Sequence, residues 1–152
     1  MYNICLKMVE NREDAEDILQ EAFVIVFKSL DTIKDKTRFP GWLKKIVVSQ
    51  CVKHIRKDVR WVELTECMYD GAGKNEDGWF RGISMAQIYA EISRLPYGCR
   101  QIFWLYVAED YSHREIAAVF GISESTSKSQ YKRARALLKK SLTKILEQNG
   151  SL

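Results

Sequence analysis

Hydrophobic side chains recur every three or four residues over most of the chain, which is the spacing of amphipathic helices. The longest such stretch covers residues 12–30, where we expect one continuous buried stripe. The stripe consists of Ala15, Ile18, Leu19, Ala22, Phe23, Val26, Phe27 and Leu30. A second long helix is expected to begin at Phe39-Pro40-Gly41-Trp42, because proline fits the first turn of a helix, and its apolar spacing continues to Ile55.

Two further segments have weaker patterns. Residues 1–10 are compatible with a helix but lack a preceding cap, so the chain reads as if it began inside a helix, after a truncation or a late start codon. A new helix is expected around residues 83–94, with a break at Leu95-Pro96. The apolar residues that follow, up to Val107, would cover the last part of the chain.

Residues 112–138 have the pattern of a helix-turn-helix whose second helix is cationic. Ser112 and Glu115 are spaced as a capping box, Gly121 permits a sharp turn, and Ser123 can cap the second helix. Basic and amide side chains near the start of that helix are suited to reading the major groove of DNA. A helical hairpin with a solvated basic face is the alternative, but cap, turn and charge together favour DNA binding.

The net charge of +4 conceals a strong alternation along the chain. Residues 1–31 carry 3 basic and 7 acidic residues, whereas residues 32–60 carry 9 basic and 2 acidic ones. Residues 61–122 are again acidic, with 5 basic and 9 acidic residues, and residues 123–152 are basic, with 7 and 2. The two basic blocks suggest two separate contacts with a phosphate backbone, which leaves the acidic blocks to be explained.

The pattern as a whole predicts an all-α protein with two small helical domains, residues 1–60 and 84–149, joined by a linker at residues 61–83. The linker is rich in glycine and charged residues, but Trp61, Trp79 and Phe80 suggest that it docks on its own domains or on a partner.

Little in the chain points to an enzyme or a membrane protein. No apolar run reaches membrane length, and the acidic residues near the start argue against a signal peptide, so we expect a cytoplasmic protein. The four cysteines lack metal-ligand spacing, so we expect neither a zinc site nor a cofactor, and Cys51 and Cys99 are expected as reduced core residues. His54 and His113 are expected to face solvent.

The order of motifs resembles the sigma-70 family of transcription initiation factors. Residues 10–57, with DAEDILQEAF followed by FPGWLKK, are similar to region 2, and residues 94–140, with REIA, GISE and KSQYKRAR, are similar to region 4. Two such regions joined by a short linker resemble the extracytoplasmic-function (ECF) subgroup.

The resemblance implies a role for each charged block. The acidic helix would dock on the clamp of the RNA polymerase β′ subunit through Asp14, Asp17, Gln20 and Glu21. The basic block would capture and track the −10 promoter element through Lys36, Thr37, Arg38, Phe39, Lys44, Lys45, Lys53, His54 and Arg56. The second basic block would read the −35 element as duplex through Lys128, Ser129, Gln130, Lys132 and Arg133, with Gln130 pairing to adenine and Arg133 to guanine.

The chain departs from the family pattern at three places. The first region 2 helix of the family extends further upstream, so its shortened form would weaken polymerase binding. Ser127 stands at a usually apolar position, where a buried hydroxyl must bond back to its helix or leave a packing loss. Tyr131 replaces an aliphatic residue and could refill that volume.

Two other functions compete with an initiation factor. A helix-turn-helix regulator that binds duplex DNA alone would need neither the acidic helix nor the FPGWLKK segment. A metal-dependent nuclease could use Asp14, Asp17 and Glu21, but no supporting histidine, second carboxylate motif or glycine-rich phosphate loop accompanies them.

The partners implied by the resemblance are macromolecules. They are core RNA polymerase, through its β′ clamp and β flap, promoter DNA, and a dedicated anti-sigma factor, which could hold the protein at the membrane. No small-molecule substrate and no membrane insertion are expected.

Overall fold

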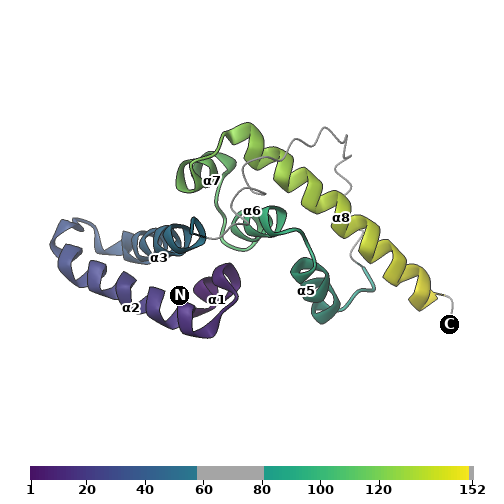
Figure 1. The fold of residues 1–152 in the computed structure, drawn as a ribbon, viewed down its shortest axis with the longest axis horizontal. Helices are drawn as coiled ribbons and strands as arrows, with labels where there is room; N and C mark the ends of the chain where they lie inside the picture. Colours follow the sequence, from purple (N-terminus) through teal and green to yellow (C-terminus); the bar gives the residue numbers. More distant parts are fainter. Residues whose placement is uncertain (58–80, 151–152) are drawn as a thin grey trace. The chain divides into compact units, whose positions relative to one another are not determined.

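The computed structural model describes residues 1–57 and 81–150, and the chain divides into two compact units, Met1–Trp61 and Val62–Leu152 (Figure 1). Every regular element in these two ranges is a helix, which confirms the all-α prediction. Within them, no helix is long and apolar enough to cross a membrane. Most of the expected linker, including Trp61, Trp79 and Phe80, lies outside the described residues.

Residues 1–57 of the first unit form three α-helices and two short 3₁₀ segments: α1 (Tyr2–Val9), α2 (Arg12–Ser29), η1 (Leu30–Thr32), η2 (Lys36–Arg38) and α3 (Phe39–Ile55). Glu10 adopts the left-handed conformation, with φ at 59°, and ends α1. The side chain of Asn11 then accepts a hydrogen bond from the backbone N–H of Asp14 at 3.2 Å and starts α2. The sharp corner between α1 and α2 is therefore built by two adjacent residues.

The core of the first unit lies where each α-helix packs on the other two. On α2 the buried positions are Ala15, Ile18, Ala22 and Val26. Ala15 and Ala22 have no exposed surface, and their small side chains let the neighbouring helices approach closely. The remaining buried side chains come from α1 and α3: Ile4, Cys5, Met8, Leu43, Val47, Val48, Cys51, Val52 and Ile55.

The predicted buried stripe on α2 is wrong at its C-terminal end. Phe23, Phe27 and Leu30 are exposed, with Phe27 at 72% of its surface. Phe23 and Phe27 follow Ala22 and Val26 by one position each, which rotates them about 100° around the helix. Two packing helices cover only the face centred on Ala22, so the apolar surface of α2 is wider than its buried part.

In its described residues, 81–150, the second unit has four α-helices: α5 (Met85–Ser93), α6 (Tyr97–Val107), α7 (His113–Phe120) and α8 (Glu124–Gly150). Ser84 and Ser112 form capping boxes at the starts of α5 and α7. Gly121 ends α7 with φ at 68°, and the Ser123 hydroxyl accepts from the backbone N–H of Thr126 at 3.0 Å to start α8. The predicted caps and turn of the helix-turn-helix are confirmed.

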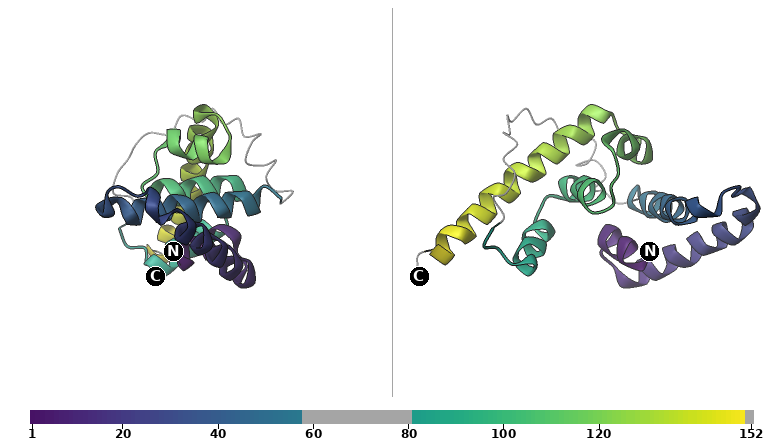
Figure 2. Two further views of the ribbon diagram at one scale, coloured as in Figure 1. Left: turned by 90° about the vertical axis from the view of Figure 1, so that its left-hand side faces the viewer. Right: turned by 180° about the vertical axis from the view of Figure 1, so that it is seen from behind.

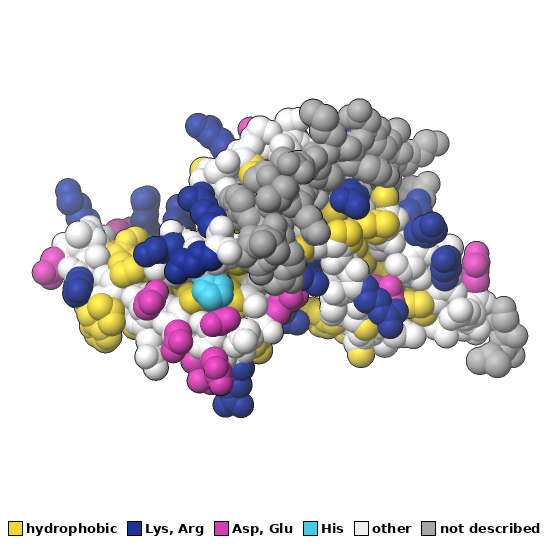
Figure 3. Space-filling model, viewed as in Figure 1, with side chains coloured by type: hydrophobic (Ala, Val, Ile, Leu, Met, Phe, Trp, Pro, Cys, Tyr) yellow, Lys and Arg dark blue, Asp and Glu magenta, His cyan; other side chains and the backbone are white. Residues whose placement is uncertain are grey.

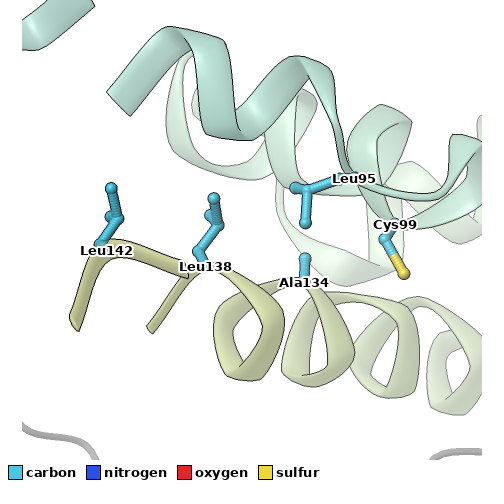
Figure 4. Close-up of a cluster of buried hydrophobic side chains, with 5 residues drawn as sticks. All are labelled: Leu95, Cys99, Ala134, Leu138 and Leu142. Atoms are coloured by element: carbon cyan, nitrogen blue, oxygen red, sulfur yellow. The ribbon is translucent and has the colours of Figure 1, made fainter. Parts of the chain in front are cut away.

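Helix α8 organises the second unit, running past α7, α6 and α5 in turn (Figures 1 and 2). Its buried positions Ala134, Leu138 and Leu142 recur every four residues along one face. They meet Leu95, which precedes α6, and Cys99 in the first turn of α6 (Figure 4). Packing along this line fixes where the N-terminal turns of α8 stand relative to α7.

Candidate functional site

The acidic residues predicted to bind a partner gather on α2. Asp17, Gln20 and Glu21 are exposed and Asp14 is half-buried. Asp14, Asp17 and Glu21 follow the i, i+3, i+7 spacing of one helix face, directly beside the buried stripe. In Figure 3 the acidic side chains of the first unit gather over α2, whereas lysine and arginine side chains line α3.

The structure brings together two residues that the sequence assigned to different partners. Nε2 of His54 on α3 lies 3.4 Å from Oδ2 of Asp14 on α2, and both side chains remain about 40% exposed. The packing of α2 on α3 brings these two residues together, although they lie far apart in the sequence. His54 is therefore partly shielded rather than freely solvent-facing, and it marks the boundary between the acidic and basic surfaces.

The residues predicted to bind the −10 element lie in two structural elements. Lys45, Lys53 and Arg56 are exposed and share one face of α3 or its C-cap, because they are spaced by eight and three residues. Lys44 is half-buried and lies one position around the helix from Lys45. The other predicted residues, Lys36, Thr37, Arg38 and Phe39, form η2 and the first residue of α3.

Asp35, which the sequence pattern did not mark as a functional residue, holds this short segment in place. Its carboxylate accepts hydrogen bonds from the backbone N–H of Thr37 at 3.0 Å and from the Thr37 hydroxyl at 2.6 Å. These bonds lower the pKa of the Asp35 carboxyl. Nε of Arg38 lies 3.5 Å from the same carboxylate. An aspartate two residues before a threonine is a local capping signal that could have been read from the sequence.

The helix-turn-helix presents most, but not all, of the predicted −35 residues. Lys128 and Lys132 are exposed one turn apart, and Ser129 and Arg133 form a parallel, half-buried pair beside them. Nζ of Lys128 lies 3.3 Å from Oε1 of Glu124. These four side chains form a polar surface on the first turns of α8, which we call the α8 polar surface.

Gln130 does not belong to that surface, so its predicted pairing with adenine is wrong. Its side chain is completely buried, and its Oε1 accepts a hydrogen bond from Sγ of Cys99 at 3.1 Å. Gln130 lies on the same face as the buried residues Ser127 and Ala134, with spacings of three and four residues. An amide on the packing face of α8 cannot reach a base edge.

Ser127 and His113 also differ from their predictions. The buried Ser127 hydroxyl lies 2.9 Å from Nδ1 of His113 on α7, instead of bonding back to its own helix. His113 is half-buried rather than solvent-facing, and its ring stacks on Tyr106 with 4.4 Å between centroids. Burial, followed by the nearby charge of Lys128, lowers the pKa of His113.

Tyr131 completes an aromatic cluster with Phe103, Tyr106 and His113. Its ring centroid lies 5.9 Å from Phe103, 4.5 Å from Tyr106 and 5.5 Å from His113. The cluster joins α6, α7 and α8 just behind the α8 polar surface. It therefore links both helices of the helix-turn-helix to α6.

In the described part of the chain, no group of three or more histidine, cysteine, aspartate or glutamate residues could hold a metal ion. Asp14, Asp17 and Glu21, which the nuclease alternative would use, lie in a row along α2 rather than around a common point.

Comparisons with known proteins agree with this arrangement. The family models for sigma-70 region 2 and sigma-70 region 4 match residues 1–61 and 85–138. The RNA polymerase sigma factor SigV of Bacillus subtilis is 26% identical over 143 residues, covering 94% of this chain and 84% of the relative. The ECF sigma factor SigW of the same species is 28% identical over an alignment of 155 residues, covering 93% and 82%.

A solved structure shares the fold. It is the sigma factor RpoE in complex with the anti-sigma factor NepR from Bartonella quintana, with a TM-score of 0.58 and 20% identity. The match covers 95% of this chain and 89% of that one. Because both sigma-70 regions are matched in the expected order, and relatives of the ECF type align along nearly the whole length, the chain belongs to the sigma-70 family of RNA polymerase sigma factors, as a member of the ECF group.

Proposed function

We propose that this sigma factor divides its contacts between opposite charges on the first unit. The acidic face of α2, formed by Asp14, Asp17, Gln20 and Glu21, binds the β′ clamp of core RNA polymerase. The segregation of exposed acidic residues on α2 from exposed basic residues on α3 is the observation that carries this proposal. DNA repels the first surface and attracts the second, so one small unit can hold two partners without competition.

The −10 element is bound by η2 and α3 as a separated strand. The short segment Lys36, Thr37, Arg38 and Phe39 receives an unstacked base, and Asp35 supports this role by fixing the backbone of that segment in advance. Lys45, Lys53 and Arg56 contact the phosphates along α3, with Lys44 and His54 at the edge of that surface.

The −35 element is bound as duplex by the α8 polar surface. Lys128 and Lys132 contact phosphates, while Ser129 and Arg133 reach base edges, and Arg133 is the residue suited to a bidentate bond with guanine. The position of these residues at the N-terminal end of the second helix of a helix-turn-helix supports the assignment. The β flap of polymerase is the further contact that the family implies for this unit.

The protein acts in the cytoplasm and is held inactive by an anti-sigma factor that covers one of these surfaces. The solved neighbour, a sigma factor bound to an anti-sigma factor, supports a partner of this type. The initiation factor has no catalytic activity and needs no cofactor.

Binding to core RNA polymerase tests the docking surface directly. Wild-type protein and the variant Asp17→Lys/Glu21→Lys are each mixed with core polymerase and run on a sizing column. We expect wild type to co-elute and the variant to lose at least tenfold in affinity, because two attractive charge contacts become repulsive.

A matched variant separates the surface from net charge. Asp31→Lys/Glu147→Lys changes the net charge by the same amount, but its residues are exposed on η1 and α8 rather than on α2. It should co-elute like wild type, and circular dichroism should show both variants folded. Equal loss in both variants, or none in either, would refute the proposed docking surface.

A further inference from the structure

Helix α8 is cationic well beyond the turns that carry the α8 polar surface. Residues 125–146 contain seven lysine or arginine residues and no aspartate or glutamate. The seven are Lys128, Lys132, Arg133, Arg135, Lys139, Lys140 and Lys144. The last three, which we call the C-terminal lysines, are exposed and follow residue 138, where the region 4 family match ends. The proposed −35 contacts do not include them.

Acidic residues of the same helix do not balance this charge. A solvated helix is commonly supported by pairs of opposite charge four residues apart, and α8 has such a pair at its start, where Lys128 lies 3.3 Å from Glu124. Further along, basic residues stand four residues from one another, a spacing at which like charges repel. These pairs are Lys128 with Lys132, Arg135 with Lys139, and Lys140 with Lys144. An anionic partner would relieve the repulsion.

Packing holds the C-terminal half of α8 in place. Leu138 and Leu142 are buried, and Ile145 packs against the same hydrophobic cluster. Ile88 and Ile92 of α5 pack against this cluster as well. The C-terminal lysines therefore stand on a helical segment that is fixed to the body of the second unit.

Helical spacing places the C-terminal lysines in line with the α8 polar surface. Lys139 shares a face of the helix with Lys132, and Lys140 shares one with Arg133, each seven residues earlier. At about 1.5 Å per residue these intervals measure about 10 Å, and Lys144 lies about one turn further on. The major groove is about 12 Å wide. A helix whose first turns lie in the groove therefore carries these lysines to the phosphates at its edge.

We propose that the C-terminal lysines bind the phosphate backbone of the promoter beside the −35 element, as a sequence-independent continuation of the contact made by the α8 polar surface. This inference rests on the proposed −35 contact and adds a second set of residues to that interface. Phosphate contacts fix the position of a protein on duplex DNA but carry no base information. The C-terminal lysines therefore raise the affinity for DNA without changing the sequence that is selected.

The salt dependence of DNA binding measures this contact, because each phosphate contact releases counterions. The intact chain is titrated into a fluorescein-labelled duplex of mixed sequence, about 30 bp long, at about 50 to 200 mM KCl, and binding is followed by anisotropy. We expect Lys139→Gln/Lys140→Gln/Lys144→Gln to bind at least about tenfold more weakly than wild type at about 0.1 M salt. The slope of log K against log salt should become less steep by about 2–3.

A matched variant separates the C-terminal lysines from net charge. Lys7→Gln/Arg12→Gln/Lys28→Gln removes the same charge from α1 and α2, which carry none of the proposed DNA contacts, and it should keep the wild-type slope. Circular dichroism should show both variants folded, since glutamine is a good helix former. A wild-type slope for the C-terminal lysine variant would overturn the proposal and leave an acidic protein surface as the partner. Equal losses in both variants would also overturn it, because net charge alone would explain them.

The variant Lys128→Gln/Lys132→Gln tests the proposed −35 contact in the same assay. If this variant lowers the slope and the C-terminal lysine variant does not, the further inference fails and the −35 contact stands. If only the C-terminal lysine variant lowers the slope, these lysines bind DNA and the contact of the α8 polar surface is refuted. Selection of random duplexes by the C-terminal lysine variant should enrich the same sequence as wild type, and a changed base preference would contradict a sequence-independent contact.

Discussion

At the scale of single residues, burial separates two neighbours on α8 that look alike in the sequence. Gln130 and Lys132 are both long polar side chains in the predicted recognition helix, yet Gln130 is buried against Cys99 and Lys132 is exposed. The polarity of a residue alone does not show whether it lies on the buried or the exposed face of α8. The four-residue spacing from Gln130 to Ala134 and onward to Leu138 and Leu142 was the available signal.

Substitutions at Gln130 and Lys132 are expected to have opposite effects on stability and on DNA binding. Gln130→Ala should lower the free energy of unfolding of the second unit by about 1–3 kcal/mol, because it removes buried volume and leaves the Cys99 donor without its acceptor. Lys132→Ala should change the free energy of unfolding by less than about 0.5 kcal/mol. It should reduce the salt dependence of promoter binding by the amount expected for about one lost phosphate contact. Urea melts and binding at several salt concentrations measure both. A stable Gln130→Ala variant with altered base preference would contradict the buried position.

His113 makes the stability of the second unit depend on pH. Its pKa in the folded protein lies below the usual value because burial disfavours the imidazolium. Below about pH 6.5, the unfolded chain therefore binds a proton more readily than the folded one, so stability falls as the pH decreases and is retained above that pH.

The variant His113→Gln isolates this effect, since its amide can still reach the Ser127 hydroxyl but does not titrate. The stability difference between pH 7.5 and 5.5, measured by urea unfolding, should be larger for wild type than for the variant. Equal differences would show that His113 does not titrate in this range.

At the scale of elements, local signals predicted where helices begin and end better than which faces they bury. Ser112, Gly121 and Ser123 act within a few residues, so their caps and turn could be predicted. Apolar periodicity marked the whole hydrophobic surface of α2, but the number of helices that cover this surface is a tertiary property. The contact between Asp14 and His54 was missed for the same reason.

Adjacent residues on α2 test its buried width. Val26 is 3% exposed and Phe27 is 72% exposed. Val26→Ala should cost about 1–3 kcal/mol of unfolding free energy, whereas Phe27→Ala should change it by less than about 0.5 kcal/mol. Thermal or urea unfolding of the intact chain measures the change in unfolding free energy for both variants. A larger loss for Phe27→Ala would restore the continuous buried stripe that the sequence pattern predicted.

At the scale of the whole molecule, charge is organised by helix rather than by domain. The first unit carries both an acidic helix and a basic one, while the second unit carries the α8 polar surface on its longest helix. A regulator that binds duplex DNA alone has no use for the exposed acidic face of α2. An initiation factor can use this face to bind polymerase. Polymerase would then hold both units on one promoter and raise their effective concentration for each other.

The most direct test of this account is the selection of random DNA duplexes by the protein with and without core RNA polymerase, followed by sequencing. With polymerase, we predict two enriched sequence blocks at a fixed spacing, and Lys132→Ala/Arg133→Ala should lose only the upstream block. Without polymerase, enrichment should be weak. A single block, selected equally well by the free chain, would contradict the proposed division of contacts and favour a regulator that acts alone.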